Sequence, residues 1–347
     1  MHPPRRVLFL QTAFIGDTIL ATSLVESWHM AFPDDSIDFC TRRGNEDLFA
    51  NHPFLNEVLV WNKSGNFWAR SWKLLLLARL IRNRKYDIVV TPHRHVSSGV
   101  LLGFSKARHK CGFANHPMAW RWTHRVEHQI GNNVHETVRN FELIKPWMSG
   151  GQPARPGLYP QFISSGAAEQ IQPESKPFVV LAPASQWFTK QWPSSHWVEL
   201  INHFASKMEN TSLYLVGGKA DRSLLEQIKK QAEHPRLSIQ TDGSLMETAA
   251  LMLRAQAVVS NDSGPLHLAS AVNAPTVALF CSTTPAFGFG PLAEKSEVVE
   301  ADEPPPCKPC GLHGHRKCPA AGEHFLCGNG LAVEKVWLAI VRVTENG

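Results

Sequence analysis

The chain has 347 residues and a formal net charge of +5, with 43% apolar and 19% charged residues, a composition ordinary for a globular protein. Its length exceeds what one hydrophobic core usually supports, so we expect two domains. No apolar run approaches the roughly 18 residues that span a bilayer, which excludes a membrane-spanning helix. The seven cysteines are an odd number, which argues against a disulfide framework.

The positive charge is concentrated in the first part of the chain. Residues 1–130 carry 17 Lys and Arg against 10 Asp and Glu, a net charge of +7, whereas the remainder carries 18 against 20, a net charge of −2. A basic first part predicts an anionic partner, such as a phosphorylated lipid, a membrane surface or a nucleic acid. The alternative is a cationic surface that is merely solvated.

Short apolar runs alternate with helical patterns along the first part of the chain. Strands are predicted at residues 7–11, 36–40, 57–60 and 87–91, and helices at residues 17–32 and 67–84. The first apolar run is too short for a signal peptide, so we expect a buried strand in a cytoplasmic protein. The alternation is typical of an α/β fold with a parallel sheet covered by helices.

The same alternation restarts after a stretch rich in turn-forming residues. Strands are predicted at 178–183, 212–218, 257–262 and 275–280, with helices starting near 194, 219, 244 and 265 and a last one at 331–343. We therefore divide the chain into domains 1–155 and 177–330, a linker 156–176 and a C-terminal helix 331–347. Ligands of such sheets bind beyond the carboxyl ends of the strands, which places the expected chemistry in the loops that follow them.

Familiar nucleotide-binding motifs are absent, but one helix start suits a diphosphate. No G-x-G-x-x-G follows a strand and no P-loop is present, which removes most NAD enzymes and P-loop NTPases. In the segment SNDSGPLHLA a strand ends before Asp262, Ser263 and Gly264 form a turn, and Pro265 and His267 occupy the first turn of a helix. Such a helix start offers N–H groups to an anion. Each residue alone has another interpretation, as a helix cap for the aspartate and serine and as a core residue for the histidine.

This segment, with the PTVALF and STTP that follow it, resembles the donor-nucleotide motif of glycosyltransferase family 9, the heptosyltransferase family. Three more segments resemble family motifs in the same order: FIGDTILATSLV at 14–25, LAPASQWFTKQWPSSHW at 181–197 and LVGGKAD at 215–221. The resemblance spans most of the chain. It implies a GT-B fold, with two Rossmann-like domains whose parallel sheets face an interdomain cleft. It also implies that residues 1–155 bind the acceptor and residues 177–330 bind the nucleotide-sugar donor.

The resemblance also assigns roles to individual residues. Asp17 matches the family's catalytic base, although a helix cap is the other interpretation of an aspartate there. Lys190 matches the cation that stabilises the departing diphosphate, and is otherwise a solvated loop lysine. The remaining residues expected to bind the donor are Ser185 and Thr189 at the phosphates, Asp221 at the ribose, and Asp262, Ser263, Gly264 and His267 around the diphosphate.

Four cysteines late in the chain suggest either a structural metal or a set of free thiols. Cys307, Cys310, Cys318 and Cys327 have the spacing C-x2-C-x7-C-x8-C. The first pair suits tetrahedral zinc, whereas the second pair is not C-x2-C, so structural zinc and a redox-active or unpaired thiol set both remain open. No metal is expected in catalysis, since the resemblance implies that protein cations and helix ends stabilise the diphosphate, and no D-x-D motif is evident.

The predicted helix 67–84 combines aromatic, leucine and basic residues. It could rest on an anionic membrane leaflet, where a lipid acceptor would be found. The interpretation favoured from sequence is a core helix whose basic residues extend along apolar surface to reach water.

Taken together, the resemblance implies an inverting transferase that moves heptose from ADP-heptose to an anionic glycolipid acceptor, the lipopolysaccharide core. No cofactor is expected besides the nucleotide-sugar co-substrate. Peripheral contact with the inner membrane is an expected interaction, and nucleic acid is not an expected partner. The alternatives are another nucleotide sugar on the same fold, a nucleotide-sugar epimerase, and a binding protein without activity.

Overall fold

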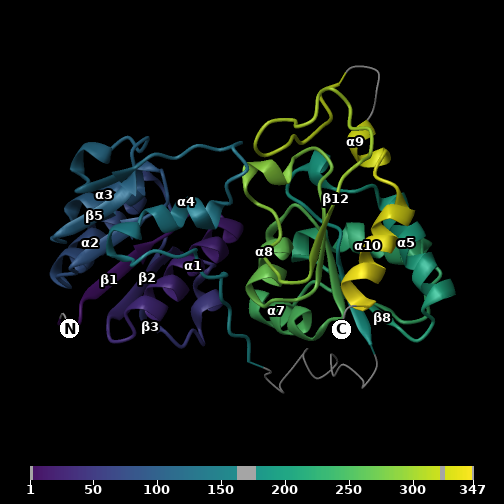
Figure 1. The fold of residues 1–347 in the computed structure, drawn as a ribbon, viewed down its shortest axis with the longest axis horizontal. Coiled ribbons are helices and arrows are strands. Elements are labelled where there is room, and N and C mark those ends of the chain that lie inside the picture. The colour runs from purple at the N-terminus through teal and green to yellow at the C-terminus, as the bar shows by residue number, and fades with distance from the viewer. Residues whose placement is uncertain (1–2, 162–176, 321–324, 346–347) are drawn as a thin grey trace. The chain divides into compact units, whose positions relative to one another are not determined.

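The computed structural model describes residues 3–161, 177–320 and 325–345, and the chain divides into two units, Met1–Tyr159 and Pro160–Gly347 (Figure 1). The predicted linker 156–176 falls largely on residues 162–176, which lie outside the described residues. None of the helices in the described ranges combines the length and the apolar character needed to cross a membrane.

The first unit contains a six-stranded parallel sheet in the order β3-β2-β1-β4-β5-β6. Its strands are β1 (Arg6–Leu10), β2 (Ser36–Arg42), β3 (Leu55–Trp61), β4 (Ile88–Thr91), β5 (His109–Phe113) and β6 (His124–Val126). Its α-helices are α1 (Ile15–Ala31), α2 (Phe67–Asn83), α3 (Val96–Phe104) and α4 (Glu136–Glu142). Short 3-10 helices lie at Glu46–Phe49, Ala119–Arg121 (η2) and Lys145–Trp147.

The second unit repeats this plan with the sheet order β12-β11-β10-β7-β8-β9, again parallel throughout. Its strands are β7 (Phe178–Ala182), β8 (Ser212–Val216), β9 (Leu237–Gln240), β10 (Ala257–Asn261), β11 (Thr276–Leu279) and β12 (Ser296–Val299). Its α-helices are α5 (Ser194–Lys207), α6 (Arg222–Gln231), α7 (Leu245–Arg254), α8 (Gly264–Ala271), α9 (Leu326–Asn329) and α10 (Val333–Glu345). Short 3-10 helices lie at Phe188–Lys190, Lys219–Asp221 and Pro285–Phe287.

Both sheets have the strand order of a Rossmann fold, so the predicted α/β class with two Rossmann-like domains is confirmed. In each unit the first strand lies at the centre of the sheet, and the chain reverses direction across the sheet between the first and fourth strands. These pairs are β1 with β4 and β7 with β10. Ligands of such folds bind beyond the carboxyl ends of that pair.

The central strands are mostly apolar because helices cover both faces of each sheet. In β1, Leu8 and Leu10 point into a core shared with α2 and α3, while Phe9 points to the other face and meets Trp28 of α1 with ring centroids 6.1 Å apart. In the second unit, α5, α6 and α10 share one core with β7, and α8 packs on the opposite face through Leu266. Each unit therefore holds its carboxyl-end loops on a rigid sheet.

The first unit extends beyond the predicted boundary at residue 155. The Tyr159 hydroxyl donates to the Glu26 carboxylate on α1 at 3.0 Å, and the Gly157 N–H donates to Thr22 at 3.0 Å. A side chain at Gly157 would collide with Glu26, because a Cβ there would lie 2.2 Å from its carboxylate oxygen. Part of the stretch expected to link the domains is thus packed onto the first one.

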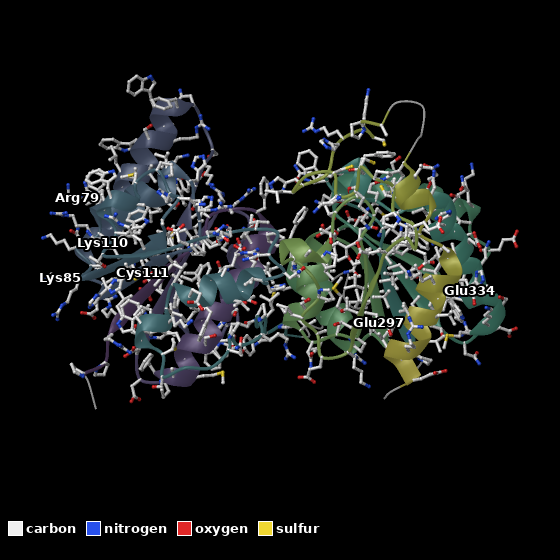
Figure 2. All side chains as sticks on the ribbon, turned by 45° about the horizontal axis from the view of Figure 1, so that its top comes forward. Arg79, Lys85, Lys110, Cys111, Glu297 and Glu334 are labelled. Atoms are coloured by element: carbon white, nitrogen blue, oxygen red, sulfur yellow. The ribbon has the colours of Figure 1, made fainter. Side chains whose placement is uncertain are left out.

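Helix α2 differs from the core helix favoured from the sequence. Only Leu77, Ala78 and Ile81 are buried, and its large side chains elsewhere are mostly exposed. Figure 2 shows Arg79 of α2, with Lys85 and Lys110, at the surface of the first unit. The core-helix interpretation is therefore wrong for most of this helix, because α2 covers the sheet with one narrow stripe only.

Candidate functional site

In the first unit, the loops that follow β1 and β4 are tied together at the carboxyl edge of the sheet. The Thr12 hydroxyl and His93 Nδ1 are 3.0 Å apart, and the Lys63 ammonium donates to the Thr12 carbonyl at 2.7 Å. Burial, followed by the nearby charge of Lys63, lowers the pKa of His93 to about 3. His93 is therefore neutral at physiological pH, so its ring can hydrogen-bond a neutral group but supplies no charge.

Asp17 lies at the same edge, in the first turn of α1. The residue that caps this helix is Phe14, so the aspartate is not the N-cap considered from sequence. Burial raises the pKa of Asp17 to about 6, with a further contribution from Glu136, while backbone N–H groups of the helix start and Arg94 oppose the shift. A half-buried carboxylate with a pKa near 6 is ionised at neutral pH and has enough basicity to accept a proton from a hydroxyl.

Sequence reasoning missed the acidic neighbour of Asp17. Glu136 begins α4, which packs against α1. Arg139 forms an ion pair with it at 2.7 Å and His128 lies 3.4 Å away. Burial disfavours its charge, but His128 and Arg139 bring the pKa of Glu136 below its ordinary value. Glu136 thus remains charged and raises the basicity of Asp17, and no signal in the sequence links positions so far apart.

In the second unit, Lys190 and Asp262 form an ion pair between the loops after β7 and β10. The Lys190 ammonium lies 2.6 Å from Asp262 Oδ2, and the Thr283 hydroxyl donates to the same oxygen at 2.7 Å. The side chains of the pair are only 13% and 7% exposed. The predicted cation and the predicted donor-binding carboxylate therefore lie together at the edge where this fold binds ligands.

Asn261, which the sequence analysis did not single out, holds the two loops in place. Its side-chain NH2 donates to the Pro183 carbonyl at 2.7 Å, and its side-chain oxygen accepts the Trp192 N–H at 3.0 Å. Asn261 is completely buried at the end of β10. Its amide therefore fixes both ends of the loop that carries Lys190.

The start of α8 offers N–H groups beside this ion pair. Ser263 is the N-cap, Gly264 is the first helical residue, and His267 is buried one turn further along. The Ser263 hydroxyl donates to the Asn261 carbonyl at 3.3 Å, so the cap makes no side-chain hydrogen bond to the helix. The Leu266 N–H donates to the Ser263 carbonyl at 3.1 Å and Pro265 has no N–H, which leaves the N–H groups of Ser263 and Gly264, next to a lysine, to bind a diphosphate.

The two predicted hydroxyl donors lie in the same loop as Lys190, in different settings. The Ser185 hydroxyl, half-buried, accepts the Trp187 N–H at 3.4 Å. The Thr189 hydroxyl is buried, accepts the His315 N–H at 2.7 Å and accepts from Ser282 at 3.0 Å. Thr189 therefore holds the cysteine-rich segment onto the loop, and a contact with phosphate from either residue stays a prediction.

Asp221 follows the Gly217–Gly218 turn after β8. Its carboxylate accepts the Gly218 N–H at 2.8 Å and so closes the turn that precedes α6. Asp221 is half-buried in the loop that follows β8, at the carboxyl edge of the sheet. This geometry suits the predicted contact with ribose hydroxyls, which stays a prediction.

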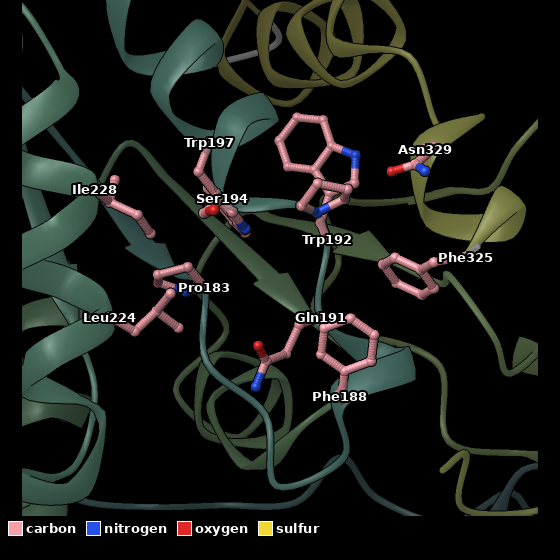
Figure 3. Close-up of a pocket in the computed structure, with 11 residues that line it drawn as sticks. Pro183, Phe188, Gln191, Trp192, Ser194, Trp197, Leu224, Ile228, Phe325 and Asn329 are labelled. Carbon is pink, nitrogen blue, oxygen red and sulfur yellow. The ribbon is translucent and has the colours of Figure 1, made fainter. Parts of the chain in front are cut away.

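A cavity of about 370 Å³ lies behind the Lys190 loop (Figure 3). Phe188, Trp192 and Phe325 surround it with aromatic rings, and the α6 residues Leu224 and Ile228 close the opposite side. None of the residues predicted to bind the donor lines it. This cavity is therefore separate from the residues predicted to bind the donor.

The four late cysteines surround a small cavity of about 20 Å³. None of the cysteines forms a disulfide; Cys310 and Cys327 are buried and Cys307 is exposed. Burial, followed by the nearby thiol of Cys310, raises the pKa of Cys327 to about 11, as is typical of a protonated, unreactive thiol. Across the part of the chain that the structure describes, no three His, Cys, Asp or Glu residues are arranged to hold a metal, and the zinc hypothesis for Cys318 and its neighbours stays a prediction.

Comparisons with known proteins find relatives that match along most of the chain. The chain is 26% identical to lipopolysaccharide heptosyltransferase 1 of Pseudomonas aeruginosa over 320 residues, covering 88% of this chain and 86% of the relative. Its fold is similar to that of Escherichia coli ADP-heptose lipopolysaccharide heptosyltransferase II, with a TM-score of 0.79, 18% identity and coverage of 98% and 99% of the two chains. An Escherichia coli heptosyltransferase solved with ADP-2-deoxy-2-fluoro heptose has a TM-score of 0.71, 19% identity and coverage of 99% and 100%.

The family relationship follows from a match that extends across both units. The model of glycosyltransferase family 9 (heptosyltransferase) matches residues 74–316, which is more than two thirds of the chain. The matched region includes the C-terminal part of α2, the Lys190 loop, the start of α8 and part of the cysteine-rich segment. The protein is therefore a glycosyltransferase, and it belongs to glycosyltransferase family 9, the heptosyltransferase family.

Proposed function

We propose that this protein is an inverting glycosyltransferase that moves heptose from ADP-heptose to a lipopolysaccharide core acceptor in the cytoplasm. The observation that carries the donor assignment is the Lys190–Asp262 pair at the start of α8. Family membership supports heptosyl transfer, and a relative of the same fold was solved with a fluorinated ADP-heptose. The same site would accept another ADP-linked sugar, which is the alternative.

The proposed reaction is a single displacement at the anomeric carbon. The acceptor hydroxyl gives its proton to the Asp17 carboxylate as its oxygen forms the new glycosidic bond. The bond between the anomeric carbon and the diphosphate breaks at the same time, and its electron pair leaves with ADP. Attack opposite the leaving group inverts the configuration. Lys190 and the N–H groups at the start of α8 stabilise the negative charge that grows on ADP.

We propose that this chemistry needs no metal, because Lys190 and the helix start supply the positive charge on the diphosphate. An epimerase on this fold would need a second carboxylate free to act on the sugar ring. Glu136, the neighbour of Asp17, is instead engaged by Arg139 and His128. This engagement favours transfer over epimerisation.

The test is an assay with ADP-heptose and a heptose-deficient core acceptor, in the presence of EDTA. We expect ADP release and a product one heptose heavier by mass spectrometry, with inverted anomeric configuration by NMR. A panel of other ADP-sugars and UDP-sugars serves as the donor control. Transfer from another donor in preference to ADP-heptose would replace the proposed donor. Activity that EDTA abolishes and Mg²⁺ restores would contradict the metal-free mechanism.

A further inference from the structure

Helix α2 exposes an unusual set of large apolar side chains. Trp68 and Trp72 are 79% and 65% exposed, and the exposed leucines lie in the following turns. We call this the α2 surface; its apolar members are Phe67, Trp68, Trp72, Leu75, Leu76 and Leu80. Isolated exposed apolar residues are ordinary, but six on one helix form a contiguous patch of the kind that marks an interaction site.

Four of the apolar residues of the α2 surface lie on one side of the helix, opposite its buried side. Trp68, Trp72, Leu75 and Leu76 are spaced by three or four residues, which places them along one stripe at about 3.6 residues per turn. Leu77 and Ile81, which face the core, project about half a turn away from that stripe. The helix thus has two apolar stripes, one packed in the core and one exposed to solvent.

The charge around this stripe is almost entirely positive. Residues 58–126 contain thirteen Lys and Arg and a single acid, Asp87. Within α2 itself, Arg70, Lys73, Arg79 and Arg82 accompany the apolar residues and no acid is present. A stripe of aromatic and leucine side chains between basic ones matches an anionic lipid surface in both apolar character and charge.

The basic region continues from α2 onto the neighbouring elements. The Arg82 guanidinium donates to the Phe104 carbonyl at the end of α3, at 3.3 Å. Burial lowers the pKa of Lys110, and the charges of Arg121 and Arg82 lower it further, so these three cations lie close together. Like charges gathered without an acidic partner are stabilised when they meet an anionic surface.

A second aromatic group stands beside these cations. Trp120 in η2 is 68% exposed, and the Arg121 guanidinium lies 5.0 Å from its ring centroid and 5.8 Å from that of the exposed Phe104. Interfacial tryptophan accompanied by arginine is typical of proteins at the headgroup level of a bilayer. The same combination of residues thus occurs on two elements of the first unit.

The α2 surface begins at the edge of the sheet that carries Asp17. Strand β3 is parallel to β1 and ends at Trp61, and α2 starts at Phe67, so the first turn of α2 lies at the carboxyl edge. The Lys63 contact with Thr12 ties this connection to the loop after β1. A lipid-linked acceptor held by the α2 surface would therefore meet the unit on the side where Asp17 stands.

We propose that the α2 surface docks the protein onto an anionic lipid bilayer, with the tryptophans and leucines in the interface and the basic residues on lipid headgroups. The proposal rests on the proposed function only in taking the acceptor to be lipid-linked. A nucleic acid would engage the basic residues but leave Leu75, Leu76 and Leu80 without a role. A second copy of the chain that docked through the same surface would meet the same positive charge and be repelled.

The experiment measures sedimentation of the full-length protein with vesicles of phosphatidylcholine, with or without phosphatidylglycerol. The wild-type protein should bind the anionic vesicles and lose affinity as salt rises. Replacing Trp72 and Leu76 together with Ser should reduce binding by about tenfold or more. Arg79→Gln should reduce it by about fivefold, from the contribution of one basic residue near a charged leaflet. The matched control replaces the exposed Leu253 and Leu338 of the second unit with Ser and should bind like wild type.

Transfer assays separate this proposal from the proposed function. The Trp72/Leu76 variant should keep wild-type transfer to a de-acylated, water-soluble acceptor and lose transfer to the acylated form of that acceptor in vesicles. If the wild-type protein transfers heptose to neither acceptor, that result counts against the proposed function alone. Wild-type vesicle binding by the Trp72/Leu76 and Arg79 variants would overturn the docking proposal. So would a loss of self-association or of oligonucleotide binding in these variants without any change in vesicle binding.

Discussion

The two units share one topology and differ in what they place at the same edge of the sheet. In the first unit the edge between β1 and β4 holds Asp17 and the neutral His93. In the second unit the edge between β7 and β10 holds Lys190 paired with Asp262 and the open start of α8. The first arrangement suits the movement of a proton, and the second suits the binding of an anion.

This difference teaches that strand order determines where a site lies, while a few side chains determine its chemistry. The two units also differ in charge, since residues 58–126, which contain thirteen Lys and Arg and a single acid, lie wholly in the first unit. We therefore expect substitutions in the first unit to change the rate of transfer or membrane binding, and those in the second unit to change nucleotide affinity.

The largest expected effect is on rate, from Asp17→Asn. This change keeps the shape of the side chain and removes its basicity, so kcat should fall by roughly 10²–10⁴. The affinity for ADP, measured by calorimetry, should stay near wild type because the nucleotide is assigned to the second unit. The exposed Asp34→Asn is the matched control and should keep full activity. Near-full kcat in the Asp17 variant with saturating acceptor would mean that the base lies elsewhere.

A smaller effect is expected on nucleotide affinity, from Lys190→Met. Loss of a charged hydrogen bond to the diphosphate should weaken ADP binding by roughly 10- to 100-fold, corresponding to about 1.5–3 kcal/mol. The buried Asp262 loses its partner as well, so the melting temperature should also fall. Calorimetry on the folded variant at low temperature separates the two effects. Unchanged affinity there would remove Lys190 from the donor site; Lys230→Met, exposed on α6, is the control.

The smallest effect concerns pH and is expected only from the first unit. Because the base acts when ionised and the pKa of Asp17 is about 6, kcat/KM should fall about tenfold for each pH unit below 6. The residual rate of Asp17→Asn should lack this dependence. His93, with a pKa of about 3, should add nothing to the profile above pH 4. If the Asp17 variant shows the same fall in kcat/KM below pH 6, another group is responsible for that fall.

The raised pKa of Asp17 also lowers the stability of the folded protein at neutral pH. A carboxyl whose pKa is raised on folding favours the protonated native state, so its charge destabilises the fold above pH 6 and has no such effect below pH 4. Asp17→Asn should therefore be more stable than wild type by about 1–2 kcal/mol at pH 7.5, after allowing for partial exposure, and equal to it at pH 4. Thermal unfolding at the two pH values measures this difference, and equal stability at pH 7.5 would show that the carboxylate is solvated.

The sequence predicts the central strands well and several of the outer ones poorly. Strands β1, β4, β7 and β10 are mostly apolar and almost entirely buried because they are covered on both faces, and all four are recognisable as apolar runs. Strand β5 has the sequence HKCGF and β6 has only three residues, so neither shows a pattern before its neighbours are known. Helix α2 was misjudged because a spacing of three and four residues marks an apolar side without saying whether it faces core or solvent.

The predicted site is recovered in part for the same reason. Lys190 and Asp262 could be expected to meet, since their loops follow strands that are adjacent in a Rossmann sheet. The position of Glu136 near Asp17 could not be expected from sequence, because it depends on how α4 packs on α1. Asn261 stands within a recognised motif, but only the structure shows that its amide holds the loop that carries Lys190.

The hydrogen bonds of Thr189 set a limit on how this enzyme can be re-engineered. The Lys190 loop is joined to the cysteine-rich segment through Thr189 and His315, and to the start of the last helical region through Trp192, whose indole donates to the Leu331 carbonyl at 2.9 Å. The Lys190 loop and two stretches more than a hundred residues later in the sequence are therefore held together in space. A chimera that takes only the Lys190 loop from a relative would leave these partners mismatched, so a graft that alters donor choice has to carry all three stretches together.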